Sequence, residues 1–367
     1  MSGPKLLVLS ASTGNGHLSA AEAIVAEAKS RGLAARHVDT LDFTPKGFQT
    51  WYRGGYETLV RRRPAAWGHL YRTSDRPLFN YWFQTRLDAA MCRGIRRLLQ
   101  AENPDWVVCT HSLPQPTLAT LRRQFSYRTA IVVTDLYPHR MWLRGRPDWY
   151  FVPQEYSRTI LERRIPWSKG HITVSGMPIS SLFKRKSSPA DGKVTALMTS
   201  GGIGGGPLIE AARAVAEAGV HLIIVAGRNA ALRDGLQAAF SQSPEVEVFG
   251  HVDQATMAGL MERSHMLVAK PGGLTTFEAL AMELPFIVYK PFLIPGQEEG
   301  NADFLVQSGA GVSVGNAEEL GSAVSRLAAD PAKRQQMAAD AKSQSMPDAT
   351  KTIVDELIRL HGIRLGQ

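Results

Sequence analysis

The chain has 367 residues, of which 44% are apolar and 20% charged, and its formal net charge is +9. These values are typical of a globular protein large enough for two domains, and two cysteines argue against a disulfide framework or a cysteine-built zinc site. No apolar run is long enough to span a bilayer. The first residues lead directly into an apolar segment, so we expect no secretory signal and a cytosolic protein.

Basic residues are concentrated in the first half of the chain. Residues 1–175 carry a net charge of +12 and residues 176–367 a net charge of −3, and the excess is densest over residues 45–100. A basic surface attracts nucleic acid, anionic lipid or phosphorylated substrates. The first half is therefore expected to meet an anionic partner.

Short apolar segments alternate with segments of helical periodicity along the chain. The predicted strands are residues 5–9, 35–39, 105–112, 128–136, 194–200, 220–227, 245–250, 264–270 and 284–290. Helices between most of them, beginning with residues 18–31, predict parallel sheets covered on both faces. The α/β pattern restarts after a polar linker at 183–193.

Two doubly wound, Rossmann-like domains facing each other across a cleft are the simplest architecture for this pattern. We place the first domain at residues 1–178 and the second at 179–346. Residues 347–367 contain a further helix, for which packing back on the first domain is one option. Ligands of such sheets bind beyond the carboxyl ends of the strands.

The first chemical candidate follows the first predicted strand. Gly14, Asn15, Gly16 and His17 lie where a strand becomes a helix. A helix N-terminus lowers the pKa of a histidine and favours its neutral form, which could take a proton from an attacking hydroxyl. A histidine that only makes a local hydrogen bond fits the position equally well, so both interpretations stay open.

A second loop, Ser200–Pro207, contains five glycines. Glycines allow close backbone approach, Pro207 suits a first helical turn, and N–H groups at a helix N-terminus suit a phosphate. We favour phosphate binding over a turn without a ligand. Neither loop matches the P-loop or the dinucleotide fingerprint. Because Asp39 lies about where a ribose-binding acid would, a dehydrogenase stays a weak alternative.

A third cluster spans residues 270–305, with a Gly-Gly turn, a short helix and a polar loop. Glu278 lies in an otherwise apolar helical segment and is a natural partner for two ribose hydroxyls. Gln297 and Glu298 could bind sugar hydroxyls. The alternative, that these acids are solvated surface residues, is weakest for Glu278.

These segments together resemble the family of monogalactosyldiacylglycerol synthases and processive diacylglycerol glucosyltransferases, which have the GT-B fold. The matching motifs, in the family's order, are STGNGHLSAAEAI (12–24), VVTDLYPHRMW (132–142), VSGMPI (174–179), SGGIGGGP (200–207), AGRN (226–229), GHVDQATMAGLM (250–261) and KPGGLTTFEALAMELPFI with PGQEEGN (270–301). Each motif alone is weak evidence for the resemblance, but the whole series in the family's order is strong evidence.

The resemblance implies an inverting transfer of a hexose, glucose or galactose, from a UDP-sugar co-substrate to diacylglycerol, with no cofactor and no metal ion. It implies that His17 is the base and Asp135 its partner or alternative. The donor-binding residues that it implies are Gly14, Gly16, Gly201, Gly202, Gly204, Arg228, Val252, Glu278, Gln297, Glu298 and Asn301. Asn15 departs from the glycine of many relatives, but asparagine tolerates left-handed backbone angles.

Residues 47–100 mix aromatic and arginine side chains. This composition suits an anionic bilayer surface, single-stranded nucleic acid, or a core with solvated arginines around it. The resemblance favours membrane docking, on the inner face of the cell membrane. The residues expected at this membrane and acceptor surface are Trp51, Tyr52, Arg61, Arg62, Arg63, Trp67 and Trp82.

Two other functions remain open. One is a related UDP-sugar transferase with another lipid acceptor, such as a polyprenyl-linked sugar. The other is a nucleotide- or nucleic-acid-binding protein without transfer activity. His17, Glu278 and Gln297 speak against the latter, so we expect no nucleic-acid partner. The donor hexose, the number of sugars added and the oligomeric state stay undecided.

Overall fold

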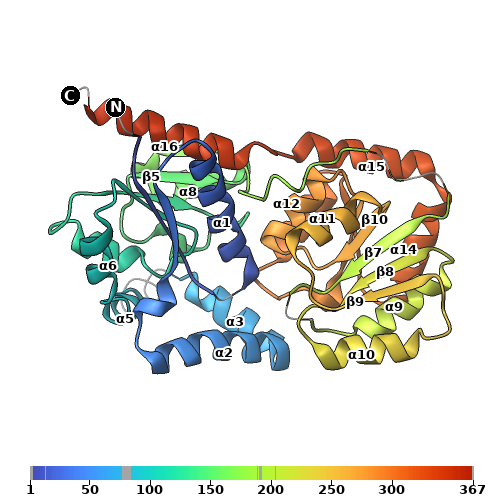
Figure 1. Ribbon diagram of the computed structural model, residues 1–367. Coiled ribbons are helices and arrows are strands. Elements are labelled where there is room, and N and C mark those ends of the chain that lie inside the picture. Colours follow the sequence, from blue (N-terminus) through green and yellow to red (C-terminus); the bar gives the residue numbers. More distant parts are fainter. Residues whose placement is uncertain are drawn as a thin grey trace. The chain divides into compact units, whose positions relative to one another are not determined.

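A computed structural model of the chain describes residues 3–12, 14–76, 84–187, 189, 192–202 and 204–365. The chain divides into two compact units, one made of residues 1–180 with 346–367 and the other of residues 181–345. Each unit is built on a six-stranded sheet in which every pair of neighbouring strands is parallel (Figure 1). The expected α/β class with parallel sheets is confirmed.

Unit 1 has the strand order β2-β1-β3-β4-β5-β6. Its strands are β1 (Leu6–Ser10), β2 (Ala35–Asp39), β3 (Trp106–Cys109), β4 (Arg128–Val132), β5 (Trp149–Val152) and β6 (Ile172–Val174). Its α-helices are α1 (Asn15–Ser30), α2 (Lys46–Arg62), α3 (Pro64–Ser74), α5 (Thr85–Met91), α6 (Ile95–Glu102), α7 (Gln115–Leu121), α8 (Glu155–Arg164) and α16 (Ala349–Leu365). Short 3₁₀ turns lie at Thr40–Phe43, Arg140–Leu143 and Pro166–Ser168.

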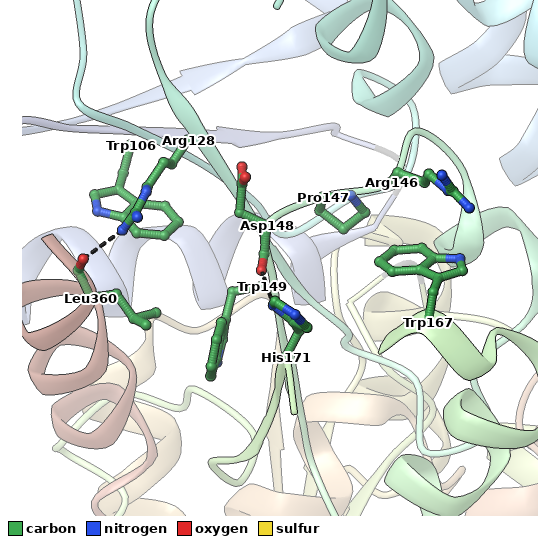
Figure 2. A pocket seen from close by; sticks show the side chains of 9 residues that line it. All are labelled: Trp106, Arg128, Arg146, Pro147, Asp148, Trp149, Trp167, His171 and Leu360. Atoms are coloured by element: carbon green, nitrogen blue, oxygen red, sulfur yellow. Dashed lines mark hydrogen bonds between the residues drawn. The ribbon is translucent and has the colours of Figure 1, made fainter. Parts of the chain in front are cut away.

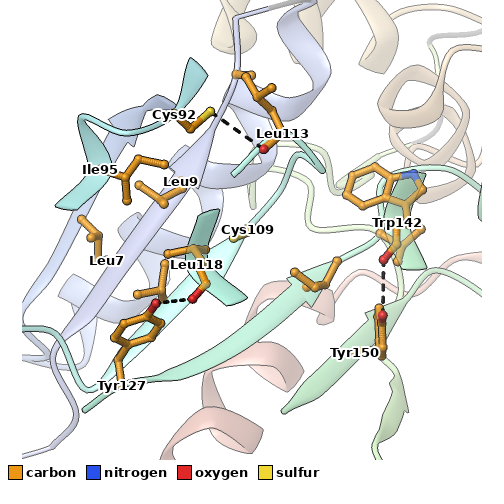
Figure 3. Packing of buried hydrophobic residues seen from close by; sticks show 14 of the residues in the cluster. Leu7, Leu9, Cys92, Ile95, Cys109, Leu113, Leu118, Tyr127, Trp142 and Tyr150 are labelled. Carbon is orange, nitrogen blue, oxygen red and sulfur yellow. Dashed lines mark hydrogen bonds between the residues drawn. The ribbon is translucent and has the colours of Figure 1, made fainter. Parts of the chain in front are cut away.

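Alternate residues of the unit 1 strands enter two different cores. Leu7 and Leu9 join the cluster that also holds Cys109 (Figure 3), whereas Leu6 and Val8 join a cluster on the other face. This follows from the two-residue period of a strand, because a sheet covered on both faces must bury both sets of side chains. The strands therefore show as continuous apolar runs in the sequence.

The final helix, α16, completes the second of these cores. It lies beside α1, and Ile353, Val354 and Leu357 are fully buried in the cluster with Leu6 and Val8. The chain returns to unit 1 past Gly176, which has a φ of 87° and would place a Cβ 2.5 Å from that of Met346. Only glycine fits this crossing, which accounts for the glycine of the VSGMPI segment.

Unit 2 has the strand order β12-β11-β10-β7-β8-β9. Its strands are β7 (Thr195–Thr199), β8 (His221–Val225), β9 (Val246–Phe249), β10 (Met266–Ala269), β11 (Phe286–Tyr289) and β12 (Gly311–Val314). Its helices are α9 (Leu208–Glu217), α10 (Ala230–Ala239), α11 (Gln254–Glu262), α12 (Gly273–Ala281), α13 (Glu299–Gln307), α14 (Ala317–Ala329) and α15 (Pro331–Gln344), with a 3₁₀ turn at Lys290–Phe292. The carboxyl ends of β11, β10, β7 and β8 are neighbours, so the loops that follow them share one edge.

Candidate active site

In unit 1, three neighbouring strands bring His17 to their carboxyl ends. β1, β3 and β4 are adjacent, and they lead to α1, to Thr110 and to Thr134 respectively. α1 begins at Asn15, so His17 and Gly16 lie in its first turn and Gly14 precedes it. No heavy atom lies within 4 Å of a Cβ built on Gly14, so that side of the turn is open.

The hydrogen bonds of His17 define its tautomer. Its Nδ1 atom lies 2.8 Å from the carbonyl oxygen of Thr110 and 3.0 Å from the hydroxyl oxygen of Thr134. A carbonyl only accepts, so Nδ1 carries the proton and the lone pair of the neutral ring is on Nε2. Among the described residues, none makes a hydrogen bond to Nε2.

Burial lowers the pKa of His17 to about 4, although its hydrogen bond to the Thr110 carbonyl acts in the opposite direction. The imidazole is therefore neutral at pH 7 and can accept a proton at Nε2. The hydroxyl of Thr110 also donates to the backbone carbonyl of His17 over 2.8 Å, which ties the first turn of α1 to the end of β3.

Asp135 does not occupy the position expected for a partner at Nδ1. Its Oδ2 atom accepts a hydrogen bond of 2.6 Å from the indole of Trp142, while Thr110 and Thr134 hold Nδ1 of His17. The structure thus corrects the partner role, and Asp135 as an alternative base stays a prediction. Sequence reasoning missed Thr110 and Thr134, because only the strand order brings them to His17.

The rings of His111 and Trp142 lie near His17, that of Trp142 at 6.1 Å between centroids. The ring of His111 is nearly perpendicular to that of His17 at 4.6 Å between centroids, and Tyr52 lies 6.4 Å from His111. Burial lowers the pKa of His111 well below its usual value, so this ring is neutral as well. The two histidine rings next to each other are therefore both uncharged at pH 7.

In unit 2, the glycine loop after β7 uses several of its own N–H groups. The nitrogens of Gly201, Gly204 and Gly205 donate to Thr199 Oγ1, the Gly201 carbonyl and Ser200 Oγ at 3.2, 3.1 and 3.0 Å. This corrects the expectation that these groups are free for a phosphate. α9 begins at Leu208, so Pro207 precedes the helix and does not lie in its first turn.

The glycines of this loop allow its backbone to lie close to the end of β8. Gly204 has a φ of 71°, and a Cβ there would lie 2.1 Å from the carbonyl oxygen of Ala226. The Arg228 nitrogen donates to the Gly202 carbonyl at 3.0 Å. Asn229 donates to the Gly204 carbonyl and caps α10 at Leu232. The loop and the AGRN segment are therefore one assembly.

Arg228 and Val252, expected near the base of the nucleotide, follow β8 and β9 at the same edge of the unit 2 sheet. The Arg228 side chain is exposed and that of Val252 half-buried. β8 lies beside β7 and β9 lies beside β8, so the two residues fall on the β8 side of the glycine loop.

Glu278 lies on α12 and is half-buried. Burial raises its pKa to about 7, and no group in the described part of the chain donates a hydrogen bond to its carboxylate. A partly buried carboxylate without a donor is a site for hydroxyl groups. This geometry is compatible with the ribose-binding role expected for Glu278.

The polar loop before α13 is arranged differently from expectation. Glu298 is buried, with 4% of its surface exposed, and its two oxygens accept from the Ile294 nitrogen at 2.8 Å and from the Lys270 ammonium. Asn301 is also buried, and its amide donates to the Pro271 carbonyl at 2.8 Å. Gln297 is half-buried beside them. Lys270, which sequence reasoning did not single out, is thus part of this cluster.

The expected membrane surface is only partly exposed. On α2, Trp51 is 64% exposed, whereas Tyr52 packs against the core of unit 1 and lies 5.1 Å from the ring of Phe48. Trp67 on α3 is half-buried, 6.1 Å from the buried ring of Tyr71. Tyr52 and Trp67 are thus only partly exposed, and their role at the membrane and acceptor surface stays a prediction.

The basic part of this surface is described less fully. Arg63, between α2 and α3, is exposed. The side chains of Arg61 and Arg62, and the whole of Trp82, lie outside the described residues. Their predicted roles stay predictions.

Unit 1 also contains a hollow of about 410 Å³ (Figure 2). It is lined by Trp106, Arg128 and Trp149, which begin β3, β4 and β5, and by Leu360 of α16. It therefore lies at the amino ends of the strands, opposite the edge that holds His17. No predicted site residue lines this hollow.

Two kinds of feature are absent from the described residues. None of the helices in this part of the chain is both long and apolar enough to cross a bilayer. The same residues include no group of three or more histidine, cysteine, aspartate and glutamate side chains placed to hold a metal ion.

The sequence matches two known protein families. The family described as monogalactosyldiacylglycerol (MGDG) synthase matches residues 17–179, and the family described as glycosyl transferases group 1 matches residues 207–344. A processive diacylglycerol beta-glucosyltransferase of Bacillus pumilus is 26% identical over 96% of this chain and 94% of its own length. The chain is thus similar to MGDG synthases over residues 17–179 and to a diacylglycerol glucosyltransferase over nearly its whole length.

Solved structures agree with the fold expected from the sequence. Acinetobacter baumannii MurG is similar with a TM-score of 0.64 and 16% identity, over 97% of this chain and 99% of that one. A UDP-N-acetylglucosamine 2-epimerase gives the same TM-score at 15% identity, over 99% and 97% of the two chains. The GT-B architecture is thus confirmed, and since an epimerase shares it, the fold alone does not define the reaction.

Proposed function

We propose that the protein transfers a hexose from a UDP-sugar to diacylglycerol with inversion at the sugar carbon, and so makes a glycolipid. The observation that carries this proposal is the neutral His17, with its lone pair on an Nε2 atom that no described group occupies. The named relatives, which are diacylglycerol glucosyltransferases, support the same acceptor.

In this reaction His17 is the base. Nε2 takes the proton of the acceptor hydroxyl, whose oxygen attacks the anomeric carbon as the bond to the UDP oxygen breaks. The bonding electron pair leaves with UDP, and Nδ1 keeps its proton against the Thr110 carbonyl throughout. The apolar surroundings of His111 and Trp142 keep water from the base.

Unit 2 is the donor-binding part in this proposal. Glu278 accepts hydrogen bonds from both ribose hydroxyls. This requires a carboxylate that accepts no hydrogen bond from another group of the protein. Arg228 and Val252 are proposed to lie near the uracil, and Gly201, Gly202 and Gly204 to let the backbone approach the diphosphate. No cofactor or metal ion takes part, so protein groups alone must stabilise the leaving diphosphate.

The acceptor is proposed to reach unit 1 from a membrane surface. Exposed Trp51 and Arg63 on and after α2 suit an anionic bilayer, to which each basic residue near the surface contributes about 1 kcal/mol of attraction. We propose that the protein is peripheral, on the inner face of the cell membrane, and the exposed Trp51 and Arg63 support this. Whether the donor is UDP-glucose or UDP-galactose is decided by experiment.

Lipid analysis of cells expressing the protein tests this function. We expect a new hexosyldiacylglycerol in the lipid extract, absent from cells that express the His17→Ala variant. A modified polyprenyl-linked lipid without any glycosyldiacylglycerol would instead point to the related transferase with another acceptor. Binding of single-stranded RNA or DNA at physiological salt, without any new lipid, would contradict the transfer function.

A further inference from the structure

Three loops of unit 2 lie around the ammonium group of Lys270. The loops after β7, β10 and β11 lie at the carboxyl ends of adjacent strands, and they supply the glycine loop, Lys270 and Glu298. Lys270 directly follows β10, the middle strand of the three. Its position is therefore set by the sheet and not by a flexible connection.

The side chain of Lys270 lies against the glycine loop. A Cβ built on Gly201 would be 2.7 Å from the Cε atom of Lys270. Any other residue at position 201 would therefore collide with the lysine stem, besides having to adopt a φ of 90°. The absence of a side chain at Gly201 is what lets the ammonium reach the loop.

Glu298 holds this ammonium, and each of its two carboxylate oxygens already accepts a hydrogen bond from this chain. Its Oε1 atom accepts from Lys270 and its Oε2 atom from the Ile294 nitrogen at 2.8 Å. With 4% of its surface exposed, an ionised Glu298 needs a cation beside it. In the described part of the chain, Glu298 is the only acceptor for Lys270, which leaves two of the three ammonium hydrogens for a ligand.

The glycine loop needs such a cation. The nitrogens of Gly201, Gly204 and Gly205 donate within the loop and to the β7 end. They cannot at the same time neutralise a diphosphate. A lysine ammonium beside the loop supplies a full positive charge where phosphate oxygens would approach the backbone.

We infer that Lys270 binds the diphosphate of the donor and that Glu298 is a positioning residue for Lys270, not a ligand of the donor sugar. This inference rests on the proposed function for the presence of a UDP-sugar. It changes the role that the family resemblance gave to Glu298, and it leaves Gln297 as the residue of that pair that faces the sugar.

Equilibrium binding of uridine, UDP and UDP-glucose by calorimetry tests both roles. Lys270→Met keeps the length of the side chain and removes its charge. We expect it to lower UDP affinity at least tenfold and to leave uridine affinity unchanged, with partial recovery in Lys270→Arg. Lys186→Met, an exposed lysine on the linker, is the matched control and should bind all three ligands as the unchanged protein does.

Glu298→Gln separates positioning from sugar binding. If Glu298 positions Lys270, the affinities for UDP and UDP-glucose fall by the same factor. A loss confined to UDP-glucose would overturn the positioning role, and equal UDP affinity in Lys270→Met and the unchanged protein would overturn the role of Lys270. Since Glu298 is buried, Lys270→Arg with Glu298 intact gives a second measurement that does not depend on how Glu298→Gln folds.

The same series distinguishes this inference from the proposed function. If the unchanged protein binds neither UDP nor UDP-glucose, the proposed function fails. If it binds both and the Lys270 variants bind them equally well, only the inference fails.

Discussion

The Nδ1 atom of His17 lies 2.8 Å from the backbone carbonyl oxygen of Thr110, a residue 93 positions later in the chain. A carbonyl cannot donate, so this contact fixes the proton on Nδ1 and leaves Nε2 as the acceptor. The carbonyl cannot be removed by substituting a side chain. The tautomer of the proposed base is therefore set by the fold, at the junction of β1, α1 and β3.

Removal of the base should abolish most of the transfer. We expect His17→Ala to lower kcat by about 10²- to 10⁴-fold, the usual contribution of a general base, while UDP affinity stays the same because unit 2 is the proposed binding site of UDP. His171→Ala, an exposed histidine at the amino ends of the strands, is the control and should leave kcat unchanged. Full activity of His17→Ala would remove His17 as the base and favour Asp135.

The second partner of Nδ1 should contribute less. Thr134→Val keeps the shape of the buried side chain and removes the hydroxyl 3.0 Å from His17. We expect kcat to fall roughly fivefold, as for the loss of one hydrogen bond worth about 1 kcal/mol, with UDP affinity unchanged. A loss as large as that of His17→Ala would mean that Thr134, and not Thr110, controls the tautomer.

Binding of the nucleoside should depend on pH through Glu278. Burial raises its pKa to about 7, so below pH 7 the group is a neutral acid and above pH 7 a carboxylate that accepts from both ribose hydroxyls. We expect uridine affinity to rise about tenfold between pH 6 and 8 and to lose this dependence in Glu278→Gln. Uridine is the ligand because it has no phosphate that titrates in this range, and 2′-deoxyuridine, with one hydroxyl fewer, should bind more weakly.

The exposed indole of α2 should anchor the protein to membranes. We expect Trp51→Ala to lower binding to anionic vesicles about tenfold, since burial of a large apolar side chain is worth about 1.5–3 kcal/mol. Tyr156→Ala, an aromatic residue that is 56% exposed on α8, is the matched control. Equal losses in the two variants, measured by vesicle sedimentation, would show that Trp51 has no special place in docking.

Much of the fold was predictable because parallel strands buried on both faces leave a simple pattern. Segments such as Leu6–Ser10, apolar except for Ser10, and Trp106–Cys109 are buried along their whole length and stand out between helical segments. The strands that escaped prediction are β5, β6 and β12, each three or four residues long. β6 and β12 are edge strands with half-buried residues, so their sequences lack a continuous apolar run.

Site residues that stand in a recognisable motif could be predicted from the sequence. Site residues that meet only through the pairing of strands could not. His17 and Glu278 stand in recognisable segments. The contacts of His17 with Thr110 and Thr134, by contrast, exist only because β3 and β4 follow β1 in the sheet. Lys270 was part of a quoted motif, but its significance depends on β10 lying beside β7 and on a partner 28 residues away.

A transfer assay with purified protein tests the central claim most directly. Diacylglycerol in anionic vesicles is incubated with UDP-glucose or, separately, UDP-galactose in the presence of a chelator, and the lipids are analysed by mass spectrometry. We predict a hexosyldiacylglycerol from one of the two donors, undiminished by the chelator and missing with His17→Ala. No glycolipid from either donor, in a preparation that binds UDP and the vesicles, would contradict the claim that this protein glycosylates diacylglycerol.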